Sequence, residues 1–232
     1  MTAVTPTPQS KIFYPSADGE PVAETYDHLY AILTTLEVLR QYLQGRRATV
    51  LANQFLYYSQ GFPRAKIAPD VMVIFNVEPG GRDNYKIWEE GQVPAVIFEM
   101  TSKATQQQDR EFKLTLYEQF GVTEYWLFDP KGEWITEKLR GYRLQGETYE
   151  LITDGKSEPL QLRLAIEAKL IGFYRLDTGE KLLIPDELVA RLQQETEARS
   201  AAEMEAEQQR QRAETLEEML TRYRERFGEL PD

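Results

Sequence analysis

Two acidic residues stand at the ends of two apolar stretches of the sequence. Asp70 opens the run DVMVIF, and Glu99 closes the run VPAVIFE. Neither run alternates apolar with polar residues, so both predict strands that are buried on both faces. A buried carboxylate is costly unless a cation or hydrogen-bond donors meet it. Two such acids at neighbouring strand ends suggest a divalent metal, although buried acids also cap helices or pair with arginine.

Composition restricts the kinds of site that the chain can build. It has no cysteine and one histidine, His28, which excludes disulfides, thiolate zinc sites, cysteine nucleophiles and multi-histidine metal sites. No apolar run approaches the ~20 residues that span a bilayer, so we expect a cytoplasmic protein without a membrane partner. Serine hydrolysis is the weakest alternative, because Ser102 lies beside Glu99 but no nucleophile elbow is present.

The elements that must position the two acids follow from the surrounding pattern. Residues 1–20 contain Pro6, Pro8 and Pro15 and predict an extended arm. The order then predicted is a helix over 24–44, strands over 49–58, 67–75 and 93–99, a helix that begins near Thr105 and ends at Gly121, and a strand over 124–129. Residues 132–184 predict antiparallel hairpins that extend the sheet. The first helix is amphipathic, with its apolar stripe on Leu29, Ile32, Leu33, Leu36, Leu39 and Leu43.

The composition changes at Pro185. The residues up to Phe227 are rich in Glu, Gln, Arg and Ala, which is typical of a long exposed helix. Its apolar seam is interrupted by Glu195, Arg199 and Gln209. The apolar positions of the seam are Leu188, Leu192, Ala202, Ala206, Ala213, Leu216, Leu220, Tyr223 and Phe227. The pattern allows three arrangements: a coiled-coil dimer, a single exposed helix, or a helix whose ends dock on the domain. The net charge of −11 divides into −6 for residues 186–232 and −5 for the rest, so the globular part is mildly acidic.

Several short motifs together resemble a known family. These are PDV at 69–71, FEMTS at 98–102, the K-x-x-x-Y spacing from Lys113, GVTEYW at 121–126 and DP at 129–130. They resemble the Uma-type putative restriction endonuclease family, a bacterial family of the PD-(D/E)XK nuclease superfamily, over roughly residues 20–184. The resemblance implies an α/β (α+β) fold, with a mixed central sheet flanked by helices. This agrees with the element order predicted above. The expected domains are therefore an arm (1–20), a restriction-endonuclease-like domain (21–184) and a helical tail (185–232).

The resemblance also implies a site and an activity. Asp70, Glu99 and the backbone carbonyl of Met100 would bind Mg²⁺ or Mn²⁺ for the hydrolysis of phosphodiester bonds in DNA. Glu24 occupies the place of an acid that superfamily members often carry in the first helix. From the residues alone, an acid in a first turn also suits the helix dipole. His28 is expected to be a surface or packing residue rather than a ligand.

The superfamily lysine is missing from its usual position. Two residues after Glu99 the chain has Thr101, so a lysine must come from elsewhere or be absent. Lys103 is one candidate, but it would lie ~13 Å along the strand from Glu99. Lys113 is the preferred one, because a lysine flanking the packed face of the second helix can extend its stem over the sheet toward the acids. The alternative is an exposed Lys113 paired with Asp109.

Two functions are therefore carried forward. The first is a metal-dependent DNA endonuclease, expected to form a homodimer with the C-terminal helix as the candidate contact. The second is a non-catalytic module of the same fold, which presents that helix for oligomerisation or partner binding.

Overall fold

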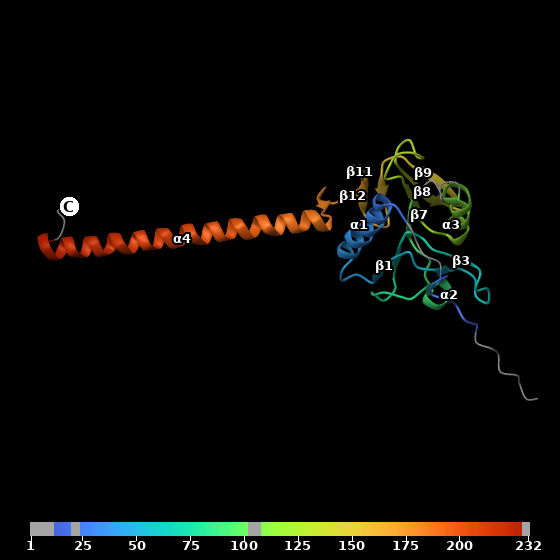
Figure 1. Cartoon of the computed structure of the whole chain (residues 1–232), viewed down its shortest axis with the longest axis horizontal. Helices are drawn as coiled ribbons and strands as arrows, with labels where there is room; N and C mark the ends of the chain where they lie inside the picture. The colour runs from blue at the N-terminus through green and yellow to red at the C-terminus, as the bar shows by residue number, and fades with distance from the viewer. Residues whose placement is uncertain (1–11, 20–23, 102–107, 229–232) are drawn as a thin grey trace, which may run out of the picture. The chain divides into compact units, whose positions relative to one another are not determined.

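A computed structural model describes residues 12–19, 24–101 and 108–228 of the chain (Figure 1). The chain divides into two compact units, Met1–Ile184 and Pro185–Asp232. The first unit contains α1 (Tyr26–Tyr42), α2 (Ile87–Glu90) and α3 (Leu114–Phe120), which continues the π-helical segment η1 (Gln108–Lys113). Its strands are β1 (Ala48–Ala52), β2 (Leu56–Tyr57), β3 (Lys66–Ile67), β4 (Val71–Phe75), β5 (Tyr85–Lys86), β6 (Val96–Met100), β7 (Glu124–Phe128), β8 (Leu139–Gln145), β9 (Thr148–Ile152), β10 (Lys156–Ser157), β11 (Leu162–Glu167), β12 (Leu170–Arg175) and β13 (Lys181–Leu182).

A six-stranded sheet forms the centre of the first unit. Its order is β1-β4-β6-β7-β8-β9. Strands β6 and β7 are parallel, because the chain crosses over between them through η1 and α3, and every other pair of neighbours is antiparallel. The predicted mixed sheet flanked by helices is confirmed. Strands β4 and β6 are almost completely buried, as their unbroken apolar runs predicted.

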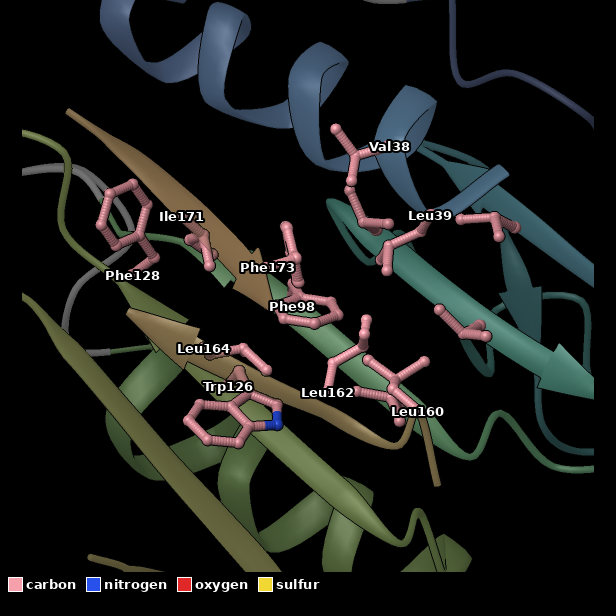
Figure 2. Packing of buried hydrophobic residues seen from close by; sticks show 14 of the residues in the cluster. Val38, Leu39, Phe98, Trp126, Phe128, Leu160, Leu162, Leu164, Ile171 and Phe173 are labelled. Carbon is pink, nitrogen blue, oxygen red and sulfur yellow. The ribbon is translucent and has the colours of Figure 1, made fainter. Parts of the chain in front are cut away.

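Successive residues of these strands supply two separate hydrophobic cores. On one face, Val96 and Phe98 pack with α1 and with β11 and β12 (Figure 2). On the other face, Ile97 packs with Tyr117 of α3. Because side chains alternate along a strand, Glu99 shares the α3 face with Ile97. The sheet therefore separates an α1 side from an α3 side at the end of β6.

Two predicted strand arrangements are wrong. The predicted strand over residues 49–58 is two strands, because Asn53 adopts a left-handed backbone with φ of 51° and ends β1. Only β8 and β9 of the predicted hairpins extend the central sheet. Strands β10 to β13 form a four-stranded sheet of their own, whose apolar residues pack against the α1 core, and β3-β2-β5 form a third sheet.

The buried face of α1 also differs from the predicted stripe. Leu29 and Leu33 are 44% and 51% exposed, whereas His28, Ala31 and Ile32 are buried. Ile32, Leu39 and Leu43 of the predicted stripe are buried, together with Thr35 and Val38, so the inner face is shifted toward His28 and Ala31 and away from Leu29 and Leu33. A buried histidine thus belongs to the inner face of the helix.

The described residues of the second unit form the helix α4 (Pro185–Phe227), which is 43 residues long. Its apolar side chains, among them Leu192, Leu216 and Leu220, are exposed. Arg191 and Arg199 each bond to a glutamate one turn later, which supports a solvated helix. No helix within the described parts of the chain has the length and apolarity to cross a membrane.

Candidate active site at the ends of β4 and β6

The two predicted acids lie at adjacent strand ends. Strands β4 and β6 run antiparallel with Val71 opposite Phe98, so the register continued by one residue sets Asp70 opposite Glu99. The Met100 backbone N–H donates a hydrogen bond to Asp70 Oδ2 over 2.6 Å. This bond fixes the Asp70 carboxylate against the end of β6.

Glu99 is held by two residues of the helix that covers its face of the sheet. Its side chain is 1% exposed, and its Oε2 lies 2.8 Å from Nζ of Lys113. The Tyr117 hydroxyl donates to Oε1 of Glu99 over 2.7 Å. Lys113 ends η1 and Tyr117 lies one helical turn later, so both project toward the sheet from one helix face. Each oxygen of the buried carboxylate therefore faces its own partner.

The tyrosine in this group stays protonated. Burial, with the nearby charge of Glu99, raises the pKa of Tyr117 well above its ordinary value. The hydroxyl is therefore a donor to Glu99 throughout the physiological pH range. Lys113 itself is 8% exposed, so the ion pair that it forms with Glu99 is buried.

Thr101 shares this face of the sheet, two residues beyond Glu99. It is 3% exposed, and its Oγ1 is buried without a hydrogen-bond partner in the parts of the chain that the structure describes. A threonine cannot reach the position of a lysine ammonium. The cation beside Glu99 comes from Lys113 instead.

Asp70 also belongs to a second group, on the α1 side. His28 Nε2 lies 3.6 Å from Oε1 of Glu24 and 3.7 Å from Oδ2 of Asp70. One ligand atom from each of these three residues lies within 4.8 Å of the other two. Their side chains are 20%, 11% and 14% exposed for Glu24, His28 and Asp70. One signal for His28 was present in the sequence, namely its position four residues after Glu24.

This second group has the chemistry and spacing of a cation site. Ligand atoms about 2.1 Å from one ion lie about 3.0 Å apart at right angles and about 4.2 Å apart when opposite. The separations of 3.6 and 3.7 Å fall between these limits. Glu24 and Asp70 supply carboxylate oxygens, which hard divalent cations prefer. The residues present thus fit a divalent cation.

Other predicted participants are placed less completely. Lys103, Ser102 and the predicted helix start at Thr105 lie outside the described residues, and the structure does not describe the side chain of Asp109. The Met100 carbonyl remains a predicted ligand. The described geometry groups Asp70 with Glu24 and His28, and Glu99 with Lys113 and Tyr117.

Another buried acid shows how a carboxylate with a structural role is held in this fold. Glu124 begins β7 opposite Val96, at the other end of β6 from Glu99. It is fully buried and bonds to Arg143, to Trp126 and to the backbone N–H of Glu158. Arginine and hydrogen-bond donors thus satisfy Glu124. The Asp70 group differs, because it brings a second acid and an imidazole to one point.

A family match agrees with the resemblance in the sequence. The sequence profile of the family described as "Putative restriction endonuclease" (Uma2) matches residues 6–172. Among solved structures, the chain is similar to the crystal structure of a "putative nuclease belonging to DUF820" from Anabaena variabilis ATCC 29413. The identity is 15% and the TM-score is 0.45, over 72% of this chain and 86% of the other. No curated protein matches the sequence.

Proposed function

The chain belongs to the Uma2 family of putative restriction endonucleases, with a PD-(D/E)XK-type fold, and from that premise we propose that it is a metal-dependent DNA endonuclease. Its active site is at the ends of β4 and β6. The observation that carries the proposal is the pairing of Lys113 with Glu99 over 2.8 Å, beside Asp70 at the neighbouring strand end. Together these residues supply the acids and the ammonium that phosphodiester hydrolysis requires.

Asp70, Glu99 and the Met100 carbonyl, with Glu24 from the approach to α1, are the proposed holders of Mg²⁺ or Mn²⁺. A bound divalent cation supplies Lewis-acid polarisation of the scissile phosphate and charge for the leaving oxygen. The Met100 N–H holds Asp70 in place through its 2.6 Å bond. Tyr117 similarly keeps Glu99 from rotating, because it binds Oε1 while Oε2 faces Lys113.

In this proposal Lys113 has the role of the superfamily lysine that is absent at position 101. Its ammonium lies beside Glu99, where it can orient the attacking water or stabilise negative charge on the phosphoryl oxygens. The π-helical turn that ends at Lys113 supports this role, since such turns occur frequently at functional sites.

A plasmid assay tests the proposal. Supercoiled plasmid is incubated with the full chain and Mg²⁺ or Mn²⁺, with and without chelator. We expect nicking that needs the cation, and at least a hundredfold loss in Asp70→Asn, because a site carboxylate is removed without a change of volume. Asp83→Asn is the matched control, since Asp83 is an exposed aspartate in the loop between β4 and β5.

The outcomes separate the nuclease from the non-catalytic alternative. Cleavage that survives in Asp70→Asn, or that resists the chelator, belongs to a contaminant or to another site. Absence of cleavage of duplex, single-stranded and branched DNA with either cation would leave the non-catalytic module as the function.

The same proposal includes self-association of the chain through α4. The observation that favours it is the exposure of Leu188, Leu192, Leu216, Leu220 and Tyr223, which lie on the predicted seam. Light scattering should give a dimer mass for the full chain and a monomer mass for the double variant Leu216→Ser/Leu220→Ser. A monomeric full chain at tens of micromolar would refute this part of the proposal.

A further inference from the structure

His28 has a position that packing alone does not explain. It is the one histidine of the chain, it lies on the buried face of α1, and its residue is 8% exposed. Its Nε2 faces the carboxylates of Glu24 and Asp70, and not the aliphatic side chains that fill the rest of that helix face. A buried polar nitrogen needs a partner, because leaving it without one is costly.

The two carboxylates do not serve as close hydrogen-bond partners of that nitrogen. The distances of 3.6 and 3.7 Å are longer than a hydrogen bond allows. They are, however, suitable distances between two ligands of one ion. A protonated imidazole paired with the acids would be drawn to about 2.8 Å from at least one of them. The spacing therefore favours a shared cation over a direct ion pair.

We propose that His28 Nε2 is a ligand of the cation held by Glu24 and Asp70, and that this nitrogen makes the site selective for Mn²⁺ over Mg²⁺. The inference rests on the proposed function, since it concerns the cation of the same site. Mg²⁺ prefers an all-oxygen octahedral shell and retains several waters. Mn²⁺ also suits carboxylate ligands, but unlike Mg²⁺ it belongs to the first-row transition-metal series, whose members bind nitrogen as well as oxygen donors.

The chemistry of the imidazole sets one further condition. For Nε2 to offer its lone pair to a cation, the proton of the neutral ring must be on Nδ1. Glutamine at position 28 retains a polar side chain but cannot donate an imidazole nitrogen. His28→Gln is therefore the informative variant, with Asp70→Asn to show that a bound ion occupies this site.

Electron spin-echo spectroscopy of bound Mn²⁺ tests the proposal directly, because a coordinated imidazole gives a characteristic ¹⁴N modulation. The full chain is used without a histidine tag, so that His28 is the only source of that signal. We expect the modulation in the wild type, and its loss in His28→Gln and Asp70→Asn. Titration should show Mn²⁺ affinity falling about tenfold or more in His28→Gln. Mg²⁺ affinity, measured by competition, should fall less than about threefold.

Two results would overturn the inference. The first is Mn²⁺ that binds in an Asp70-dependent way without imidazole modulation in the wild type, and the second is failure of the wild type to bind Mn²⁺ at millimolar concentration. The spectrum of the wild type alone shows whether an imidazole binds Mn²⁺, even if His28→Gln does not fold. Cleavage with Mg²⁺ but no imidazole signal would refute the His28 ligand and support the nuclease function. An imidazole signal without cleavage would support the His28 ligand and refute the nuclease function.

Discussion

Replacing Lys113 with methionine should reveal how strongly Glu99 depends on its cation. Methionine keeps most of the volume of the lysine stem but removes the ammonium that lies 2.8 Å from Oε2 of Glu99. Glu99 is 1% exposed, and its carboxylate is held by Lys113 and Tyr117. In the variant only the Tyr117 hydroxyl of this pair would remain beside the buried charge. Breaking a buried pair by removing one partner costs about 3–5 kcal/mol. Urea unfolding followed by circular dichroism, with chelator present, should show a loss of that size.

Two further variants make this measurement interpretable. In Lys113→Met/Glu99→Gln the buried charge is gone, so most of the lost free energy of unfolding should return. Lys169→Met is the matched control, because Lys169 also forms an ion pair, to Asp27 over 2.7 Å, but its side chain is 59% exposed. The control should lose no more than about 1 kcal/mol. Equal losses for the two lysines, or no recovery in the double variant, would refute a buried Lys113–Glu99 pair.

Three other expectations concern the framework. Gly141→Ala should lower the free energy of unfolding by about 1–3 kcal/mol in urea, because its Cβ would approach the buried Trp126 ring to 2.5 Å; a change below 0.5 kcal/mol would contradict that packing. Hydrogen bonds from Arg82 lower the pKa of Glu90 below its ordinary 4.5, so Arg82→Gln should cost about 1–2 kcal/mol at pH 7. That cost should disappear as the pH falls through the lowered pKa, and a constant cost in chemical unfolding from pH 7 to 3 would exclude the linkage. Truncation after Ile184 should leave cooperative thermal unfolding, and its loss would show that residues 185–232 belong to the folded core.

The sequence was sufficient for the parts of the fold that local pattern determines. The unbroken apolar runs around Val73 and Ile97 predicted buried strands, and the order of elements predicted a mixed sheet, because these signals depend on neighbouring residues alone. The separate sheet of β10 to β13 was not predictable in this way. Strand β12 has the same short aromatic pattern as β8 and β9, and what distinguishes its sheet is packing against α1.

The residues of the candidate site were likewise predictable only where a local pattern identified them. Asp70 and Glu99 stood out because an acid within a buried run is costly and therefore conspicuous. His28 did not, since a lone histidine in a helix becomes a candidate ligand only when its face is known to be buried toward Asp70. The bond of Tyr117 to Glu99 joins residues 18 positions apart through the packing of α3 on the sheet, and no local pattern encodes it.

Cleavage by Lys113→Met tests most directly whether the strand-end acids and the helix-borne lysine act on the same phosphodiester. The measurement is the single-turnover rate of plasmid nicking at saturating Mn²⁺, alongside wild type and Lys169→Met. Lys113 is placed beside the cation site and not among its ligands, so the rate should fall at least a hundredfold while Mn²⁺ binding persists. Nicking by Lys113→Met at the wild-type rate, with Mn²⁺ bound as in the wild type, would contradict a role for this lysine in the active site.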